Sequence, residues 1–244
     1  MMAEILIERR FCGPPDSGHG GYSCGVVAAH VGGPAEVTLR RPPPLDTTLA
    51  VARADDGSVR VLNGDELIAQ GERSDDDVGV DVPDPVSIPE AEAAGAASHL
   101  HRHPEDHPFP TCFVCGPKRA PGDGMRIIVG RVAGREVAAG AWTPAIDLAD
   151  SSGAVRPEFV WAALDCSGGV GSWLVDRIGG NPFVLGRFAV RIPAPVRAGA
   201  PHAVVGWRIG VDGRKLTAGS AIFTAGGELA GVARATWIQL AQPR

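Results

Sequence analysis

The sequence predicts an α+β fold in which one helix packs against an antiparallel sheet, and it predicts this arrangement twice. A strand that alternates apolar and polar residues and then stops at prolines occurs at residues 37–45 and again at 188–196. Residues 64–67 and 226–229 share a Gly-x-Glu-Leu turn. A short apolar segment of helical character precedes each copy of the strand. We therefore expect two similar subdomains, with an asymmetric site between them.

The first half is expected to contain one helix and five strands. The helix spans residues 20–31, presents Tyr22, Val26 and Val27 on one face, and ends at a Gly-Gly-Pro turn. A loop rich in glycine and proline, residues 12–19, leads into this helix. The strands are expected at residues 5–10, 35–41, 47–53, 59–62 and 66–72.

Residues 73–111 differ in composition, and we interpret them as a linker between one unit at residues 1–72 and another at 112–244. The linker begins with an acidic run, and its Val-Pro-Asp-Pro string cannot form a central strand because proline has no N–H to donate. One short helix is expected at residues 89–100, with Ser87 as its N-cap. We expect the linker to lie over the surface.

The second half is expected to begin with a hairpin whose strands are residues 125–132 and 136–142. Pro157 suits the first turn of a helix, which we expect to end near Asp165 or Gly168. Four longer strands are then expected, at residues 184–192, 203–211, 215–224 and 229–240.

The composition indicates a globular protein and excludes several classes of function. Hydrophobic residues make up 44% of the 244, enough for a packed core. A net charge of −5 argues against a nucleic-acid partner, which needs clustered Lys and Arg. No apolar run approaches the roughly 20 residues of a membrane span. The five unevenly spaced cysteines do not suit a secreted disulfide framework, and the start has no signal layout. We expect a cytoplasmic bacterial protein without membrane or nucleic-acid partners.

The order of one strand, a helix and several antiparallel strands resembles the hot-dog fold of acyl-CoA thioesterases and dehydratases. The resemblance is closest over residues 188–237, where a strand ending in Arg-x-Pro precedes a hairpin and a Gly-Glu-Leu-x-Gly turn. It is weaker over residues 18–72. Two such units in one chain are similar to the double hot-dog arrangement, in which the pair mimics the usual homodimer. The resemblance implies a tandem hot-dog, each unit being one central helix wrapped by a curved antiparallel sheet, and it leaves a homo-oligomer open.

The string Gly18-His19-Gly20-Gly21-Tyr22 opens the first helix and resembles the His-Gly-Gly opening of the central helix in phenylacetate-pathway thioesterases. In that family, backbone N–H groups at the helix start polarise the thioester carbonyl. The first N–H groups of a helix lack partners and lie at the positive end of its dipole, and glycine lets a substrate approach them. The alternative is a flexible turn with an exposed histidine.

The acid of that family lies further along the same helix. At the matching position the first half has Ala28, whereas the second half has Asp165. Hot-dog thioesterases form their sites across two units, so the resemblance implies one composite site. In it, Asp165 would activate water or attack directly, while the N–H groups of Gly20, Gly21 and Tyr22 would hold the carbonyl oxygen.

The resemblance also has consequences for the neighbouring residues. Pro157 has no N–H, so the twin site at the start of the second helix would be inactive. His19, Trp161 and Arg126 are expected to contact the substrate, which would be an acyl-CoA or another thioester, and no cofactor or metal is expected. In the alternative interpretation, Asp165 bonds locally to the end of its own helix. Glu158 is a rival acid, although an acid at a helix start also serves the dipole.

The most unusual local string surrounds Cys112 and Cys115, whose Cys-x-x-Cys spacing is half of a zinc site. His101, His103 and His107 lie just upstream, but no second Cys-x-x-Cys follows. We therefore expect a packed loop with both cysteines buried and without metal. Cys166 follows Asp165 and has no histidine near it in sequence, so it is interpreted as packing.

The sequence thus favours an acyl-CoA thioesterase-like hydrolase, with two alternatives. One alternative is a non-catalytic acyl or acyl-CoA binder, because one half lacks the acid. The other is an enoyl-CoA hydratase-like enzyme, which needs an aspartate and a histidine on one loop. The segment from Asp176 to Asn181 has no nearby histidine, so this second alternative is weaker.

Overall fold

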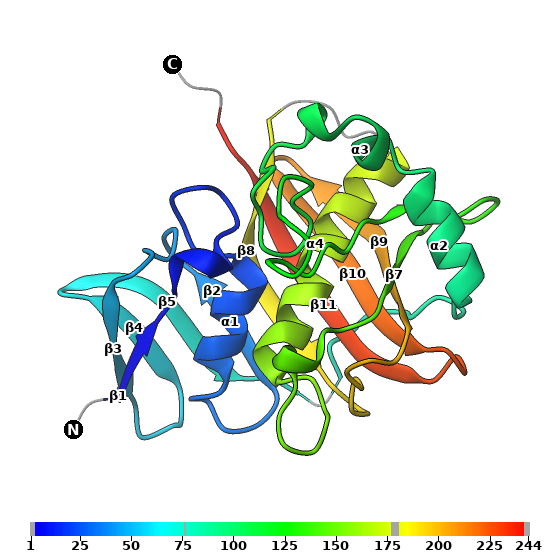
Figure 1. The fold of residues 1–244 in the computed structure, drawn as a ribbon. Helices are drawn as coiled ribbons and strands as arrows, with labels where there is room; N and C mark the ends of the chain where they lie inside the picture. The colour runs from blue at the N-terminus through cyan, green and yellow to red at the C-terminus, as the bar shows by residue number, and fades with distance from the viewer. Residues whose placement is uncertain (1–2, 76, 177–180, 242–244) are drawn as a thin grey trace.

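The computed structural model describes residues 3–75, 77–176 and 181–241, and these residues form one antiparallel sheet with helices packed against it (Figure 1). The strands are β1 (Ala3–Leu6), β2 (Ala35–Leu39), β3 (Thr48–Arg53), β4 (Val59–Asn63), β5 (Glu66–Arg73), β6 (Gly130–Arg131), β7 (Ala138–Trp142), β8 (Phe183–Arg191), β9 (His202–Asp212), β10 (Lys215–Thr224) and β11 (Leu229–Gln239). The 11 strands follow the order β1-β3-β4-β5-β2-β8-β11-β10-β9-β7-β6.

The same order of strands occurs on both sides of the middle of the sheet. The first half runs β1-β3-β4-β5-β2, and the second half runs β7-β9-β10-β11-β8 with the short β6 added at its edge. The halves join where β2 pairs with β8, with Val37 opposite Phe188. Both of these side chains are fully buried, at 0% exposure. One hydrophobic core therefore continues across the junction.

Two helices, α1 (Gly20–Ala28) and α4 (Pro157–Asp176), pack against each other on the same face of the sheet, as Figure 1 shows in blue and yellow-green. Helix α4 continues beyond Asp165 and Gly168, where the sequence was expected to end it. The helix was expected to end early because glycines such as Gly168, Gly169 and Gly171 normally weaken a helix. Here they allow close contact with the sheet: a Cβ atom added to Gly169 would lie 2.4 Å from the ring of Trp237. Packing energy outweighs helix propensity at this point.

The segment between the halves is more closely packed than a surface linker. Helix α2 (Ile88–Ala96) begins at a capping box in which Ser87 accepts a hydrogen bond from the Glu90 N–H, as expected for this N-cap. The expected single helix is divided, since a second short helix, α3 (His99–Arg102), follows. Ala91 and Ala94 on α2 are buried against the second half. Three short 3₁₀ helices complete the described elements: η1 (Arg9–Phe11), η2 (Pro104–Asp106) and η3 (Ile146–Leu148).

Two expected strands are much shorter than the sequence suggested. The opening strand is β1, Ala3–Leu6, because the chain turns into η1 at Arg9. The first strand of the expected hairpin at 125–132 is reduced to β6. The residues before β6 instead form backbone hydrogen bonds with the cysteine loop: Met125 donates to Phe113, and Ile127 donates to Val114. We use the name cysteine loop for residues 107–126.

Arg119 fastens the cysteine loop to the first half. Its guanidinium, with a side chain only 10% exposed, donates to the carbonyl oxygens of Arg10 at 2.6 Å and Thr111 at 2.8 Å. It also pairs with Asp123 at 3.0 Å. Backbone contact adds to this, since Phe113 N–H donates to the Cys12 carbonyl at 2.8 Å. The loop is therefore attached to the segment that precedes α1.

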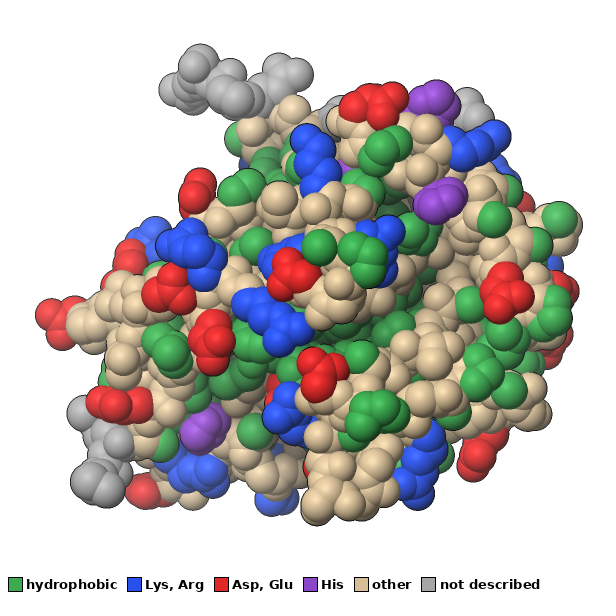
Figure 2. Space-filling model, in the orientation of Figure 1, with side chains coloured by type: hydrophobic (Ala, Val, Ile, Leu, Met, Phe, Trp, Pro, Cys, Tyr) green, Lys and Arg blue, Asp and Glu red, His purple; other side chains and the backbone are tan. Residues whose placement is uncertain are grey.

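No helix among the described residues is long and apolar enough to cross a membrane. On the face shown in Figure 2, Lys and Arg side chains are interleaved with Asp and Glu, so this face carries no broad surface of one charge.

The contact between α4 and β9 gives a first prediction. A Cβ atom on Gly206 would lie 1.8 Å from the Ser167 carbonyl oxygen, whereas a Cβ atom on Gly210, in the same strand, would meet nothing within 4 Å. We expect Gly206→Ala to lower the free energy of unfolding by about 2–3 kcal/mol through overpacking. Gly210→Ala should change it by less than about 0.5 kcal/mol. Urea denaturation of both variants measures the difference, and equal effects would contradict the described packing.

A second prediction concerns the attachment of the cysteine loop. Arg119→Met should lower the free energy of unfolding by about 2–3 kcal/mol, because the Arg10 and Thr111 carbonyls lose a charged donor. Arg126→Met is the matched control in the same loop, since the Arg126 side chain is exposed and, among the described residues, donates only to the Arg119 carbonyl. Its effect should stay within about 0.5 kcal/mol. A control variant as unstable as Arg119→Met would show that the loop is held by other contacts.

Candidate active site between the two central helices

The two central helices touch through glycines on α1. A Cβ atom on Gly21 would lie 2.4 Å from the Cβ of Asp165 and 2.6 Å from the Trp161 carbonyl oxygen. A Cβ atom on Gly25, one turn later, would lie 2.7 Å from the Cα of Glu158. Residues four apart share one face of a helix, so these glycines form a smooth surface on which α4 rests. The contact brings Asp165 to the start of α1.

Asp165 forms a hydrogen bond with the first turn of α1. Its Oδ2 accepts from the Gly21 N–H at 2.6 Å and lies 3.5 Å from the Nε2 of His19. Its Oδ1 is buried and has no hydrogen-bond partner among the described residues. The residue is 2% exposed. A carboxylate at this point interacts favourably with the positive end of the helix dipole.

His19 is the N-cap of α1 rather than an exposed loop residue. Its Nδ1 accepts a hydrogen bond from the Tyr22 N–H at 3.2 Å, which satisfies one donor of the first helical turn. Its Nε2 faces Cys166 Sγ at 3.1 Å. The backbone N–H of His19 donates to the Phe11 carbonyl at 2.8 Å, and the side chain is 2% exposed. The ring is therefore fixed at the meeting point of both helices.

Burial and neighbouring charges alter the acidity of the groups in this site. Burial raises the pKa of Asp165 to about 6, although His19 and the Gly21 N–H act in the opposite direction. Burial lowers the pKa of His19, but the effects of Cys112 and Asp165 are opposite and together larger, so the pKa is raised overall. Burial also raises the pKa of Tyr22 to about 12. Tyr22 is therefore neutral at physiological pH.

The cysteine loop lies against the residue that follows Asp165. Cys115 Sγ is 3.3 Å and Cys112 Sγ is 3.7 Å from Cys166 Sγ. Hydrogen bonds from Cys115 and Cys166 lower the pKa of Cys112. Cys112 is buried as expected, whereas Cys115 is only partly buried because it borders a small cavity. Cys166 is buried, as a packing residue would be, and its thiol also lies against His19, which is 147 positions away in sequence.

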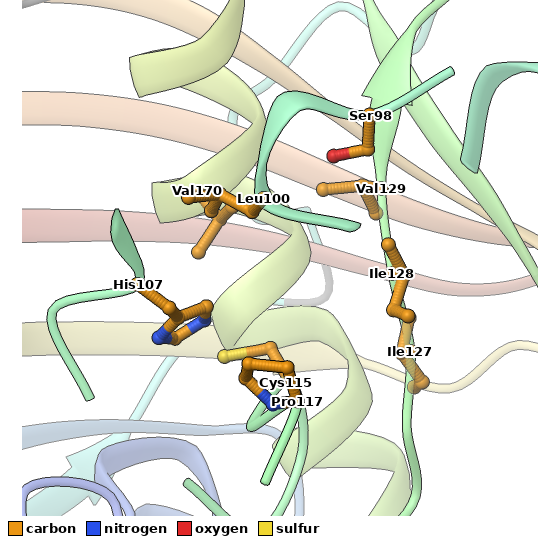
Figure 3. Close-up of a pocket in the computed structure, with 9 residues that line it drawn as sticks. All are labelled: Ser98, Leu100, His107, Cys115, Pro117, Ile127, Ile128, Val129 and Val170. Atoms are coloured by element: carbon orange, nitrogen blue, oxygen red, sulfur yellow. The ribbon is translucent and has the colours of Figure 1, made fainter. Parts of the chain in front are cut away.

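The histidines upstream of the cysteines do not join this cluster. His99 and His103 pair with Asp106 at 2.6 Å and Glu105 at 3.4 Å on the surface. His101 is exposed. His107 lines the same small cavity as Cys115, beside α4 (Figure 3), and its Nδ1 accepts a hydrogen bond from the Phe109 N–H. Sequence proximity suggested His101, His103 and His107 as partners of the cysteines, and the fold brings His19 instead.

The other residues expected at the site fall into two groups. Trp161 is 5% exposed and packs edge-on against Phe188, with ring centroids 5.5 Å apart. Tyr22 stacks on Phe11 at 4.3 Å. Both lie in the shared core near Asp165. Arg126, in contrast, is exposed on the cysteine loop and donates to the Arg119 carbonyl. The structure thus brings the helix-borne residues together and leaves Arg126 on the surface of the loop.

The matching place at the start of α4 is built differently. Pro157 occupies the first position and offers no N–H. Glu158 pairs with Arg156 at 3.4 Å, and its side chain is 26% exposed. Ala28 supplies no carboxylate. The acid and the N–H groups of a helix start therefore coincide at the start of α1 but not at the start of α4.

Access to Asp165 is closed in this structure. Two cavities of about 10 Å³ each, enough for roughly one water molecule, lie beside the cysteine loop and in the core of the first half. Neither is lined by Asp165 or His19. Asp165 is 2% exposed, so a substrate can reach the carboxylate only if a covering segment moves. The cysteine loop, which packs on the adjacent Cys166, is such a segment.

Comparison with solved structures identifies the fold of the chain. No protein-family model and no curated protein sequence matches the chain. A hot-dog protein of unknown function from Alicyclobacillus acidocaldarius aligns over 98% of this chain and 93% of its own, with 10% identity and a TM-score of 0.63. A candidate oleoyl thioesterase from Lactobacillus plantarum aligns over 98% of this chain and 96% of its own, with 10% identity and a TM-score of 0.56.

A shorter similarity is found to a thioesterase superfamily protein, with 20% identity and a TM-score of 0.41. It extends over 48% of this chain, and the chain spans about half, 55%, of that protein's length. The fold is therefore assigned from the two structures that align over almost the whole chain. They confirm that the chain has the hot-dog fold.

Proposed function

We propose that the chain is a tandem hot-dog protein that hydrolyses acyl-CoA or related thioesters at one composite site. The units would be residues 1–72 and 112–244, joined by residues 73–111. The shared order of strands in the two halves supports the duplication. The observation that carries the function is the 2.6 Å hydrogen bond from the Gly21 N–H to Asp165. It joins an acid from one half to the helix start of the other.

The proposed reaction uses the Gly21 N–H first and the Asp165 carboxylate second. The thioester carbonyl oxygen takes the place of Asp165 Oδ2 at the Gly21 N–H, where a donor at the helix start stabilises the negative charge that develops on oxygen. The displaced carboxylate then lies beside the carbonyl carbon. It accepts a proton from the attacking water, and the C–S bond breaks. The proton passes to the departing thiolate, so the products are a carboxylic acid and a free thiol.

The buried surroundings of Asp165 suit this reaction once the substrate has entered. Trp161 and Leu185 border the carboxylate region and are both apolar and buried. Water is excluded there, so each hydrogen bond to the developing charge contributes more than it would in solvent. The acyl chain would extend between the apolar faces of α1 and α4, and entry requires displacement of the cysteine loop.

A second candidate is a non-catalytic acyl-thioester binder. It is favoured by the closure of the site: Asp165 already accepts the Gly21 N–H, and it is 2% exposed. In this case the carboxylate would serve as a fixed cap on α1. The two candidates differ in a measurable way, because a binder retains saturable affinity for acyl-CoA without releasing free CoA.

The decisive variant is Asp165→Asn, which keeps the shape of the side chain and removes its charge. We expect hydrolysis of a panel of acyl-CoA esters by the wild-type protein, and a fall in kcat of about 10²-fold or more in the variant. Glu158→Gln is the matched control, since it makes the same change two turns earlier on α4 and should leave kcat within about twofold. Free thiol release is the measurement.

Two results would decide against hydrolysis at Asp165. Unchanged turnover in a folded Asp165→Asn protein would remove the acid from the mechanism. Binding of acyl-CoA by calorimetry without any thiol release from the wild-type protein would establish the binder.

A further inference from the structure

The cluster of three cysteines and one histidine beside Asp165 is not used by the proposed hydrolysis. His19 comes from the cap of α1, Cys112 and Cys115 from the cysteine loop, and Cys166 from the middle of α4. The four side chains thus join the start of α1, the cysteine loop and α4 at one point. From this arrangement we infer that the cluster is a tetrahedral metal site for Zn²⁺.

The distances between the ligand atoms fit such a site. Around Zn²⁺, with Zn–S near 2.3 Å and Zn–N near 2.0–2.1 Å, neighbouring sulfurs lie about 3.8 Å apart and sulfur and nitrogen about 3.6 Å. The three distances to Cys166 Sγ are 3.7 Å from Cys112, 3.3 Å from Cys115 and 3.1 Å from His19 Nε2. The ligand atoms of His19, Cys112 and Cys166 all lie within 4.8 Å of one another. Cys115 Sγ lies outside this group of three, so it would move toward the other ligand atoms when the shell closes.

The backbone of the cysteine loop holds both of its thiols in place. Gly116 N–H donates to the Cys112 carbonyl at 2.9 Å, which closes a tight turn around the pair. A Cβ atom on Gly116 would lie 2.4 Å from that carbonyl oxygen, so the turn requires glycine. Cys-x-x-Cys in a tight turn is the spacing that structural zinc sites use.

The number of thiols favours a metal over a disulfide. A disulfide joins two sulfurs at about 2.05 Å, so any pairing within the cluster would leave the third cysteine unused. A divalent ion uses all four groups. Binding would displace the three thiol protons, because thiolates are the ligands. Coordination through Nε2 would place the ring proton on Nδ1, so the 3.2 Å hydrogen bond that Nδ1 accepts from the Tyr22 N–H would be lost, and the metal–nitrogen bond at Nε2 would hold the ring.

A closed shell of four protein ligands is typical of structural zinc sites, whereas catalytic sites keep an open position. The metal would therefore fasten the cysteine loop to both central helices. This inference does not depend on thioester hydrolysis, since it concerns thiols and an imidazole that the reaction leaves untouched.

The test is the metal content of the full chain, purified without chelator from zinc-supplemented cells. We expect about one Zn²⁺ per chain, and after exchange into Co²⁺ the intense visible bands of tetrahedral thiolate-bound cobalt. Cys166→Ala should reduce the zinc content at least tenfold. Cys24→Ala is the matched control, because Cys24 is equally buried on α1 but lies outside the cluster, and it should keep its metal.

Measurements on the wild-type protein keep the inference testable if Cys166→Ala fails to fold. A protein without zinc that gives no cobalt bands under reducing conditions would overturn it. A disulfide between two of Cys112, Cys115 and Cys166, found by mass spectrometry of the freshly purified chain, would also overturn it.

Discussion

The close contact between α1 and α4 is the constraint on which the rest of the site depends. Gly21 and Gly25 leave no side chain between the helices, so the backbone of α4 lies directly on α1. This closeness brings Asp165 within hydrogen-bond distance of the Gly21 N–H and brings Cys166 within reach of His19. The glycines were expected to admit a substrate to the backbone. In the closed structure they admit the neighbouring helix instead.

Much of the fold follows from local sequence. The alternating strands of the second half, the capping box at Ser87 and the turn residues are all short-range signals, and the structure contains each of them. The length of α4 could not be predicted in this way, because its glycines are stabilised by Trp237 and the sheet rather than by helix propensity. The expected strand at 125–132 failed for a similar reason, since its hydrogen bonds go to the cysteine loop.

Only part of the composite site could be predicted from the sequence. Comparing the two halves pointed to Asp165 and to the helix start at Gly20 to Tyr22, and the structure brings Asp165 to Gly21. The same reasoning missed the cluster around Cys166, because its four members lie in three segments that are joined only by tertiary packing. The Cys-x-x-Cys spacing was a valid signal, but its nearest histidines in sequence were the wrong ones. The segment from Asp176 to Asn181, which was considered for a hydratase-like site, includes residues 177–180, and these lie outside the described residues.

The two proposals make opposite demands on the cysteine loop. A metal at Cys112, Cys115, Cys166 and His19 fastens the loop, whereas a thioester needs the loop to move before it can reach Asp165. The most direct measurement is a crystal structure with a ketone analogue of acyl-CoA, in which carbon replaces the thioester sulfur. The account predicts its carbonyl oxygen about 2.7–3.1 Å from the Gly21 nitrogen, with the Asp165 carboxylate moved beside the carbonyl carbon. An analogue bound elsewhere, with Asp165 still bonded to Gly21, would contradict it.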